Sequence, residues 1–415
     1  MRPPRAAPNR DCEGCEGVAK ILFLAHRAPF PPDKGDRIRA YHILRHLAAR
    51  HEVWLGASAD DPQTPPLPDG LCRAACIAPH GPVRRALNMA AGALTGAPLS
   101  VARFRHPVLE QWIQRVLRDE QPDVVFIYSS ALAQYVVGKA PPGTKLIVDF
   151  VDADAEKWRA YGAQASPPMR WVYRAEFRRL VAFDRRTASV ATAALFVSET
   201  ERRLFARFAP EAASKLHVVA NGVDVDYFKP AAGPIEAANI VLCGRMDYWP
   251  NVDGAAWFAN EVLPRVRQVR PDATFRIVGA APTPTILALA ALPGVEVTGA
   301  VPDVRPYLAR AAVVVAPLRI ARGIQNKVLE GMAAGKIVVA TPAAMEGIGA
   351  TPGRDALVAG DAAAFAEAVT DAIEGRRPTL GANARRYVVA HHRWESHLAA
   401  LDRLVAEGCS AEAAA

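Results

Sequence analysis

The stretch PLRIARGIQNKVLEGMAAGKIVVAT (residues 317–341) indicates the fold of this chain more clearly than any other. An apolar run of strand length leads into a loop that contains Gly323. A helical pattern then opens near Ile324 and ends at Gly335, before a second apolar run. A strand, a loop, a helix and another strand in this order are typical of a parallel sheet whose faces are both covered by helices.

The same alternation continues along nearly the whole chain. The apolar runs lie at residues 20–25, 52–57, 123–128, 145–151 and 194–198, and then at residues 239–243, 274–279, 295–299, 312–317 and 336–340. Two such series predict an α/β chain of two facing, Rossmann-like, doubly wound parallel-sheet domains. Ligands bind outside the carboxyl ends of parallel strands, so the expected site is a cleft between the domains.

A turn signal divides the two series. The segment NGVDVDYFKP (residues 221–230) combines an Asn-Gly turn with a closing proline. We therefore expect an N-terminal domain over residues 1–225, which begins with a tail over residues 1–17. A C-terminal domain is expected over residues 226–380, and residues 381–415 form a final segment.

The helix expected after Gly35 has an apolar stripe with one member every third residue. Its members are Ile38, Tyr41, Leu44 and Leu47. Arg37, Arg39 and Arg45 lie outside this stripe.

The composition excludes several classes of protein. The 415 residues are 51% hydrophobic and 22% charged, which is typical of a globular chain and not of collagen, a coiled coil or a disordered protein. No apolar run approaches the length of a membrane span, and six scattered cysteines do not form a secreted disulfide framework. We therefore expect a cytoplasmic protein.

A zinc site remains an alternative for two closely spaced cysteine pairs, Cys12 with Cys15 and Cys72 with Cys76.

The net charge of +8 predicts an affinity for anions such as phosphate or acidic lipid. Nucleic acid is not expected, because no aromatic-basic recognition motif is present.

The helix near Ile324 has free N–H groups and a positive dipole end, which favour a phosphate there. Gly323 allows close approach, and Lys327 on the first turn adds a contact of about 1.5–3 kcal/mol. Glu330 can accept hydrogen bonds from sugar hydroxyls. The alternative is that both side chains are merely solvated.

Residues 317–341 resemble the C-terminal signature of GT-B glycosyltransferases of family 4, which are retaining enzymes that use nucleotide sugars. In that signature a Glu is followed by seven residues, a second Glu, a small-residue helix and a strand. Glu330 and the GMAAGKIVVAT that follows it match the second half. The resemblance therefore implies that Glu330 holds the donor ribose. The first Glu position falls on Arg322, so no role is carried over to it.

Other segments resemble the same family. GRMDYWPNVDG (residues 244–254) is similar to a turn whose Arg and Lys grip the donor diphosphate; Arg245 fits, and the Lys position falls on Asn251. Residues 276–280 and 298–318 are similar to the segments that seat nucleobase and ribose. The final segment resembles the family's last helix, which returns to the N-terminal domain. The donor-binding residues implied are Gly35, Arg245, Gly279, Val301, Pro302, Asp303, Gly323, Ile324, Asn326, Lys327 and Glu330.

The N-terminal half supplies the candidates for catalysis. Gly35 lies in a loop that resembles the one approaching donor phosphate and acceptor, or is needed only for a turn. Asp152 follows a predicted strand, where a carboxylate can accept the proton of the acceptor or balance oxocarbenium charge. Asp154 and Glu156 are weaker acceptor-side candidates. The alternative is that Asp152 caps the helix that follows it.

Metal is not expected in the reaction. The Asp-x-Asp pairs Asp152/Asp154 and Asp224/Asp226 match a metal motif of another glycosyltransferase fold, but the match is short. We therefore expect a metal-independent reaction in which Arg245, Lys327 and the helix terminus neutralise the leaving group.

Three tracts, residues 26–48, 149–161 and 246–258, resemble the sugar transferases associated with exopolysaccharide and exosortase (PEP-CTERM) systems. This implies a nucleoside-diphosphate sugar donor and a glycan or polyprenyl-linked acceptor. Residues 170–186 form a basic helix with Trp171, Phe177, Leu180 and Phe183, which either lies on an acidic membrane surface at the inner face of the plasma membrane or packs in the core.

Two rival functions remain open. One is a catalytically impaired scaffold that binds nucleotide sugars, suggested by Arg322 and Asn251 at motif positions. The other is a sugar-nucleotide epimerase of the same fold.

Overall fold

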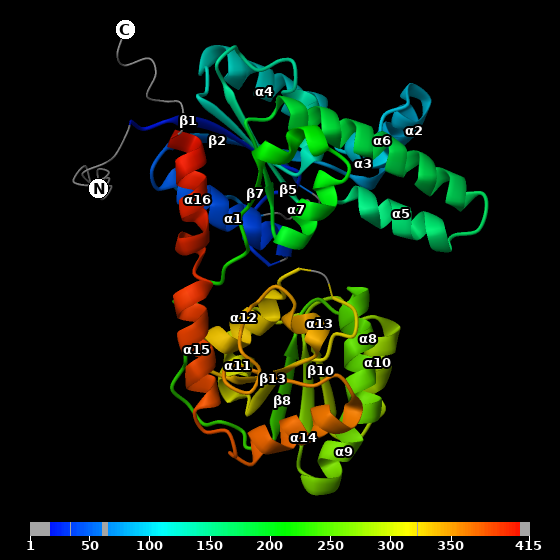
Figure 1. Ribbon diagram of the computed structural model, residues 1–415, viewed down its shortest axis with the longest axis vertical. Coiled ribbons are helices and arrows are strands. Elements are labelled where there is room, and N and C mark those ends of the chain that lie inside the picture. Colours follow the sequence, from blue (N-terminus) through cyan, green and yellow to red (C-terminus); the bar gives the residue numbers. More distant parts are fainter. Residues whose placement is uncertain (1–16, 34, 60–64, 322, 407–415) are drawn as a thin grey trace. The chain divides into compact units, whose positions relative to one another are not determined.

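Two parallel sheets, each with helices on both faces, account for most of the chain (Figure 1). The computed structural model describes residues 17–33, 35–59, 65–321 and 323–406. The chain divides into a first unit, Met1–Val219 with Leu398–Ala415, and a second unit, Ala220–His397. The predicted α/β class is confirmed, and all ten predicted strands are present.

The first unit contains a seven-stranded parallel sheet in the order β3-β2-β1-β4-β5-β6-β7. Its strands are β1 (Lys20–Ala25), β2 (Glu52–Ala59), β3 (Ala74–Pro79), β4 (Val124–Tyr128), β5 (Lys145–Val151), β6 (Ala193–Phe196) and β7 (Leu216–Val218). Its helices are α1 (Gly35–Ala48), α2 (Pro82–Thr95), α3 (Leu99–Ala102), α4 (Pro107–Asp119), η1 (Ser130–Tyr135), α5 (Ala155–Gln164), α6 (Met169–Val190), α7 (Glu199–Ala206) and η2 (Pro210–Lys215). After β1 the chain adds β2 and β3 on one side of that strand, and it then adds β4 to β7 on the other side. The place between β1 and β4 where the order of addition changes is the topological switch point of this sheet.

The second unit contains a six-stranded parallel sheet in the order β10-β9-β8-β11-β12-β13. Its strands are β8 (Asn239–Cys243), β9 (Thr274–Val278), β10 (Val295–Gly299), β11 (Val313–Ala316), β12 (Ile337–Ala340) and β13 (Leu357–Val358). The helices after β7 are α8 (Trp249–Trp257), η3 (Phe258–Val262), α9 (Leu263–Val269), α10 (Pro284–Ala288), η4 (Leu289–Ala291), α11 (Arg305–Arg310), α12 (Asn326–Ala333), α13 (Pro342–Met345), α14 (Ala362–Ile373), α15 (Leu380–His391) and α16 (Trp394–Ala406). The switch point lies between β8 and β11.

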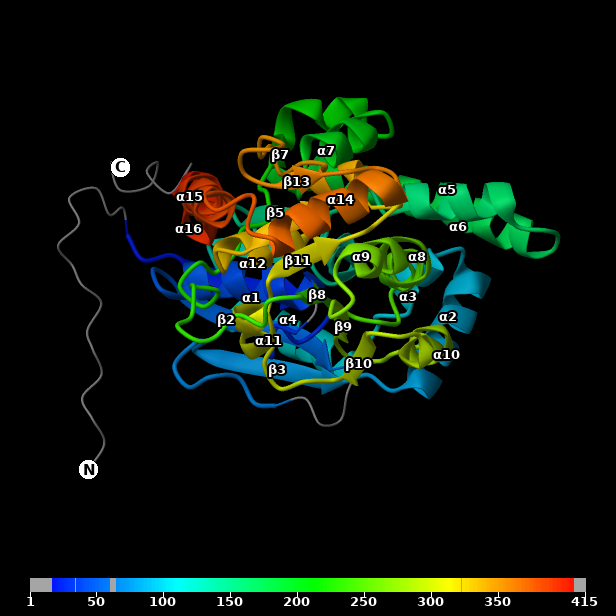
Figure 2. The same ribbon diagram turned by 90° about the horizontal axis from the view of Figure 1, so that it is seen from below.

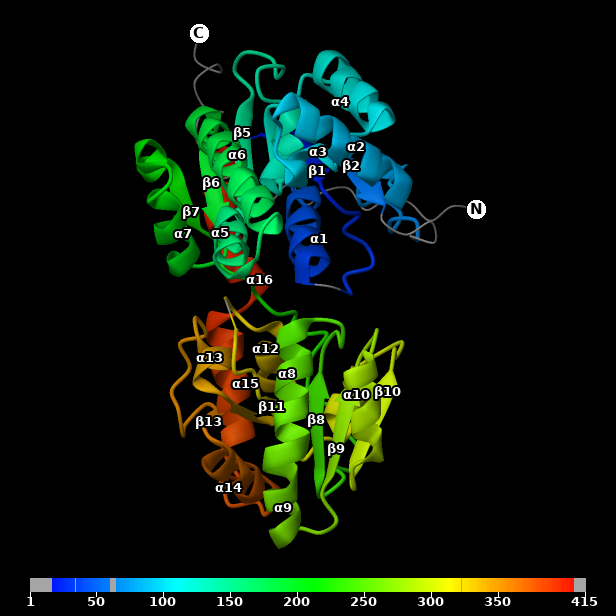
Figure 3. The same cartoon turned by 90° about the vertical axis from the view of Figure 1, so that its right-hand side faces the viewer.

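Alternating side chains along β8 show how both faces of the second sheet are covered. Ile240 and Leu242 belong to one apolar core, whereas Val241 and Cys243 belong to the other. Figure 3 shows β8 between β9 and β11 in the middle of this sheet. Because both faces are covered, the strand reads as a continuous apolar run. The three strands that the sequence did not predict, β3, β7 and β13, are short or partly exposed.

Two helices settle details that the sequence left open. Helix α12 begins at Asn326, two residues after the predicted start, because Gln325 still has extended backbone angles. In α6, Leu180 is buried, and Phe177 and Phe183 pack against the same core, so the core alternative holds for these three side chains. Trp171, at the start of the same helix, is exposed. Among the described residues, no helix has both the length and the apolar character needed to cross a bilayer.

The end of the chain is bonded to the first unit. Asp402 of α16 lies 2.7 Å from the Nε2 atom of His46 in α1. The Lys145 ammonium at the start of β5 donates to the carbonyl of Val405 over 2.5 Å.

A buried ion pair joins α1 to β5 in the first unit. The guanidinium of Arg39 donates to the Asp149 carboxylate over 2.8 and 3.2 Å, and also to the carbonyl of Val219 over 2.8 Å. Arg39 is 1% exposed and Asp149 is fully buried. Arg39 lies outside the apolar stripe of α1 and is nevertheless buried, because Asp149 neutralises its charge in the interior.

Substituting Asp149→Ala should lower the free energy of unfolding of the first unit by about 3–5 kcal/mol, because the Arg39 charge would remain buried without its partner. Urea unfolding followed by circular dichroism measures this loss. The control is Asp119→Ala, which breaks the exposed pair with Arg118 and should cost less than about 1 kcal/mol. Equal losses in the two variants would show that the buried pair is not critical for stability.

Candidate active site

Two glycine turns meet through their backbones at the carboxyl edge of the second sheet. Gly244 follows β8, and Gly279 follows the neighbouring strand β9. A Cβ atom on Gly279 would lie 1.7 Å from the carbonyl oxygen of Gly244, and one on Gly244 would lie 2.8 Å from the Nδ2 atom of Asn251. Any larger side chain at Gly279 would force these loops apart. The predicted donor-binding residue Gly279 thus has a structural role in shaping this edge of the sheet.

Lys327 reaches back from α12 to the turn after β8. Its ammonium donates to the Oδ1 atom of Asn251 over 2.7 Å, and the Nδ2 atom of Asn251 donates to the carbonyl of Arg245 over 2.7 Å. Asn251 is 3% exposed. Lys327 is therefore not a freely solvated side chain. The family resemblance expects a lysine at position 251. The amide of Asn251 stands there instead and holds the ammonium of Lys327.

Glu330 lies one turn after Lys327 on α12. Burial raises the pKa of Glu330 to about 7, against the opposing effect of Lys327. Burial also lowers the pKa of Lys327 to about 8, although Glu330 and Cys243 oppose this shift. The two groups are consequently both charged over a narrow range near pH 7–8, and a bound anion would favour the charged form of Lys327.

The start of α12 has the backbone that a close ligand approach requires. Gly323 has a φ of +65°, in the left-handed region that favours glycine. The Oδ1 atom of Asn326, the first helical residue, is buried and has no hydrogen-bond partner among the described residues. Ile324 lies next to Gly347. Arg322 lies outside the described residues.

The other predicted donor-binding residues lie further along the sheet edge or form ion pairs with residues two positions away in the sequence. Arg245 donates to its neighbour Asp247 over 3.0 and 2.5 Å. The loop after β10 carries Val301, Pro302 and Asp303, two strands away from β8 in the sheet order. Arg305 donates to Asp303 over 2.9 Å and lowers the pKa of that carboxyl. The structure therefore brings Lys327, Glu330 and the turn after β8 together, and Val301 in the loop after β10 packs against the same apolar core as the buried side chains of α12.

The predicted catalytic residue Asp152 follows β5 in the first unit. The strand ends at Val151, whose φ of +67° is strained for a β-branched residue. Lys157 lies 3.4 Å from an Asp152 oxygen and 2.5 Å from one of Asp154. Asp154, not Asp152, is the N-cap residue of α5, which disfavours the capping alternative for Asp152. Glu156 is buried and bonded to Arg159 over 2.5 Å.

A group of side chains at the switch point of the first sheet was not predicted from the sequence. The ring of His26, just after β1, stacks on Tyr128 at the end of β4, with centroids 5.6 Å apart. Asp36 lies 3.6 Å from the Nε2 atom of His26 and 2.5 Å from Arg27. Although burial opposes the shift, these contacts hold the pKa of Asp36 well below its usual range. The signal in the sequence was the position of His26 and Tyr128 at the ends of two apolar runs.

Two buried polar atoms in this group have no hydrogen-bond partner among the described residues: Nδ1 of His26 and the Tyr128 hydroxyl. They give the first unit polar atoms that a bound hydroxyl compound can satisfy. The nearby Gly35 starts α1, and a Cβ atom there would meet only open space.

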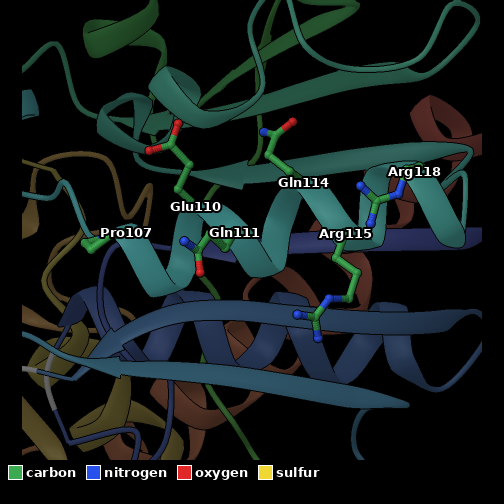
Figure 4. A pocket seen from close by; sticks show the side chains of 6 residues that line it. All are labelled: Pro107, Glu110, Gln111, Gln114, Arg115 and Arg118. Carbon is green, nitrogen blue, oxygen red and sulfur yellow. The ribbon is translucent and has the colours of Figure 1, made fainter.

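A shallow depression of about 440 Å³ lies elsewhere, along one face of α4 (Figure 4). Its lining residues are Pro107, Glu110, Gln111, Gln114, Arg115 and Arg118. All six belong to the helix, and none was a predicted site residue. The depression is consequently not part of the candidate site.

The three cysteines that the structure describes, Cys72, Cys76 and Cys243, show no feature of an activated thiol. Burial raises the pKa of Cys72 to about 12 and also raises that of Cys76. Cys12 and Cys15, the other pair in the zinc alternative, lie outside the described residues. Within the described part of the chain, no three His, Cys, Asp or Glu side chains gather in a way that could hold a metal ion.

Comparison with protein families gives two matches that agree with the two units. Residues 35–222 match the glycosyl transferase 4-like domain, and residues 237–375 match the glycosyl transferases group 1. A search of curated proteins finds no match to this sequence.

Solved structures with the same fold cover nearly the whole chain. Sucrose-phosphate synthase from Thermosynechococcus elongatus is 16% identical, with a TM-score of 0.68 over 93% of this chain and 98% of its own. Anabaena HepE in complex with UDP-glucose is 18% identical, with a TM-score of 0.63 over 94% and 100%. WaaG, a glycosyltransferase involved in lipopolysaccharide biosynthesis, is 16% identical, with a TM-score of 0.60 over 92% and 99%. The chain therefore carries a glycosyl transferase 4-like domain followed by a glycosyl transferases group 1 domain, and it is a glycosyltransferase with the GT-B fold.

Proposed function

We propose that this glycosyltransferase moves a sugar from a nucleoside-diphosphate sugar to a polysaccharide or lipid-linked acceptor, with retention of anomeric configuration. One observation carries the proposal: the Lys327 ammonium is held by Asn251 beside the turn after β8, at the switch point of the second sheet. A cation fixed in that place, next to the first turn of α12, suits a diphosphate. The complex of HepE with UDP-glucose supports a donor of this class.

The second unit would bind the donor. Lys327 faces the diphosphate, Glu330 accepts from the ribose hydroxyls, and the glycines at positions 279 and 323 allow the backbone to come close. Arg245 can exchange its exposed partner Asp247 for phosphate at little cost, because exposed ion pairs are weak. In this proposal these groups neutralise the departing nucleoside diphosphate, and the reaction needs no metal ion.

The first unit would bind the acceptor. Asp152 carries an accessible carboxylate directly after a strained residue at the end of β5. Such a group can take the proton of the acceptor hydroxyl or balance positive charge on the reacting sugar. Asp154 and Glu156 would contribute less, because Asp154 is paired with Lys157 and Glu156 is bonded to Arg159.

The proposed setting is exopolysaccharide or cell-envelope synthesis, of the type associated with PEP-CTERM systems. The enzyme would act in the cytoplasm, with peripheral contact to the acidic inner face of the plasma membrane. The resemblance of the three tracts supports this setting, as does the structural likeness to WaaG.

The rival scaffold function rests on the two departures at Asn251 and Arg322. The bond between Lys327 and Asn251 weakens the first of these arguments, because a lysine ammonium still lies beside the turn. An epimerase, unlike a transferase, would convert the donor without any acceptor, so product analysis with and without acceptor separates these functions.

The pH profile of kcat/KM for the donor should be bell-shaped. Below about pH 7 Glu330 takes up a proton and loses the negative charge that strengthens its hydrogen bonds from the ribose, and above about pH 8 Lys327 loses the charge that binds diphosphate. Glu330→Gln should abolish the acidic limb and lower kcat/KM about tenfold, the scale of a lost charged hydrogen bond. The exposed Glu367→Gln serves as the control and should keep both limbs. An acidic limb that persists in Glu330→Gln would assign it to another group.

Asp152→Asn should lower kcat by about a hundredfold, the scale of general base catalysis, and leave the dissociation constant of the donor within about twofold. Asp154→Asn is the matched control, because its carboxylate faces the same Lys157. Stopped assays of transfer and calorimetric titration of the donor give the two quantities. Equal turnover in Asp152→Asn and the parent enzyme would remove Asp152 from the catalytic step.

A further inference from the structure

Helix α2 is attached to the first unit by its polar and small residues. The guanidinium of Arg85 donates to the carbonyl of His80 over 2.9 and 2.6 Å, and the amide of Asn88 donates to the carbonyl of Arg105 over 2.7 Å. Gly92 is the one buried residue of the helix, and a Cβ there would lie 2.5 Å from that of Ala102. These three anchors recur at spacings of three and four residues, so they share one face of the helix.

The opposite face of α2 is apolar and exposed. Val83, Leu87, Ala90 and Leu94 follow the same helical spacing, about half a turn away from the anchors. Val83 is 72% exposed, Leu87 67% and Leu94 90%. A surface helix of a globular protein normally buries its apolar stripe and exposes its polar one. Helix α2 does the reverse, which indicates that something covers the stripe.

The charges around the stripe identify the partner. Residues 70–109 contain five arginines and no Asp or Glu, and Arg84 is exposed beside the stripe. An apolar face flanked by positive charge, with no negative charge nearby, matches the chemistry of an anionic lipid surface. A soluble protein partner would have to present an equally apolar patch without basic residues.

A second exposed apolar element lies on the same side of the first unit. Helices α5 and α6 pack side by side, and their tip projects in the same direction as α2 (Figures 1 and 2). Trp171 is 64% exposed, Tyr161 54% and Met169 44%. Tryptophan and tyrosine favour the boundary between lipid headgroups and acyl chains. Arg174 is exposed one turn after Trp171.

We propose that the stripe Val83, Leu87, Ala90 and Leu94 of α2 docks on an anionic lipid bilayer, with the α5–α6 tip as a second contact. The docking surface deepens the proposed function, since it would hold the acceptor unit at the membrane where a lipid-linked acceptor lies. It is distinct from the α6 side chains that pack in the core, and it involves no residue of the donor site.

The test is sedimentation of the full chain with phosphatidylcholine vesicles, with and without phosphatidylglycerol, in the absence of substrates. The parent protein should bind the anionic vesicles, bind neutral ones weakly and be released by high salt. Leu87→Glu/Leu94→Glu should weaken binding at least about tenfold, because two charges replace buried apolar side chains. The matched control is Val269→Glu/Leu287→Glu, which changes exposed apolar residues of the second unit and should bind as the parent does.

Each other outcome overturns the proposal. Equal binding by the α2 variant and the parent would place the lipid contact elsewhere, and no binding by the parent would exclude a lipid contact. Sedimentation velocity without vesicles adds a third outcome: a parent dimer that becomes a monomer in the α2 variant would assign the stripe to a second copy of the chain. Titration of the same proteins with the donor separates a failed docking proposal from a failed proposed function. Because Leu87 and Leu94 lie outside the donor site, the α2 variant should bind the donor as the parent does, whatever its binding to vesicles.

Discussion

The contact between the backbones of Gly244 and Gly279 is the constraint on which the donor site depends. A Cβ on Gly279 would lie only 1.7 Å from the Gly244 carbonyl, so the turns after β8 and β9 pack without side chains between them. This packing leaves the turn after β8 where Asn251 can reach the Arg245 carbonyl on one side and Lys327 on the other. Because β8 and β11 are parallel neighbours, the start of α12 lies at the same edge of the sheet as the turn after β8.

Much of the fold was predictable from the sequence, because strands buried on both faces are continuous apolar runs. The strands β3, β7 and β13 were missed because they are short or partly exposed and lack such runs. Lys327 and Glu330 were predicted from their position at the start of a helix. The bond from Lys327 to Asn251 was not predictable, since it joins residues 76 positions apart.

The buried charged groups of the first unit stabilise the fold, whereas those of the second unit have shifted pKa values at the proposed donor site. In the first unit, Arg39 and Asp149 neutralise each other and join α1 to β5. Their burial could not be read from helical spacing, which placed Arg39 outside the apolar stripe. In the second unit, Lys327 and Glu330 are held with pKa values displaced toward neutrality, which is typical of groups that meet a charged ligand. His26 and Tyr128 were not predicted because their contact joins the ends of β1 and β4, which become neighbours only in the folded sheet.

The most direct measurement is calorimetric titration of the full chain with a panel of nucleoside diphosphates and the matching monophosphates. A fixed ammonium at position 327 predicts that one diphosphate binds more tightly than its monophosphate. It also predicts that Lys327→Met weakens the diphosphate about tenfold or more while changing the monophosphate little. If diphosphate and monophosphate bind equally, or if Lys327→Met binds the diphosphate as the parent does, the diphosphate is not held by Lys327.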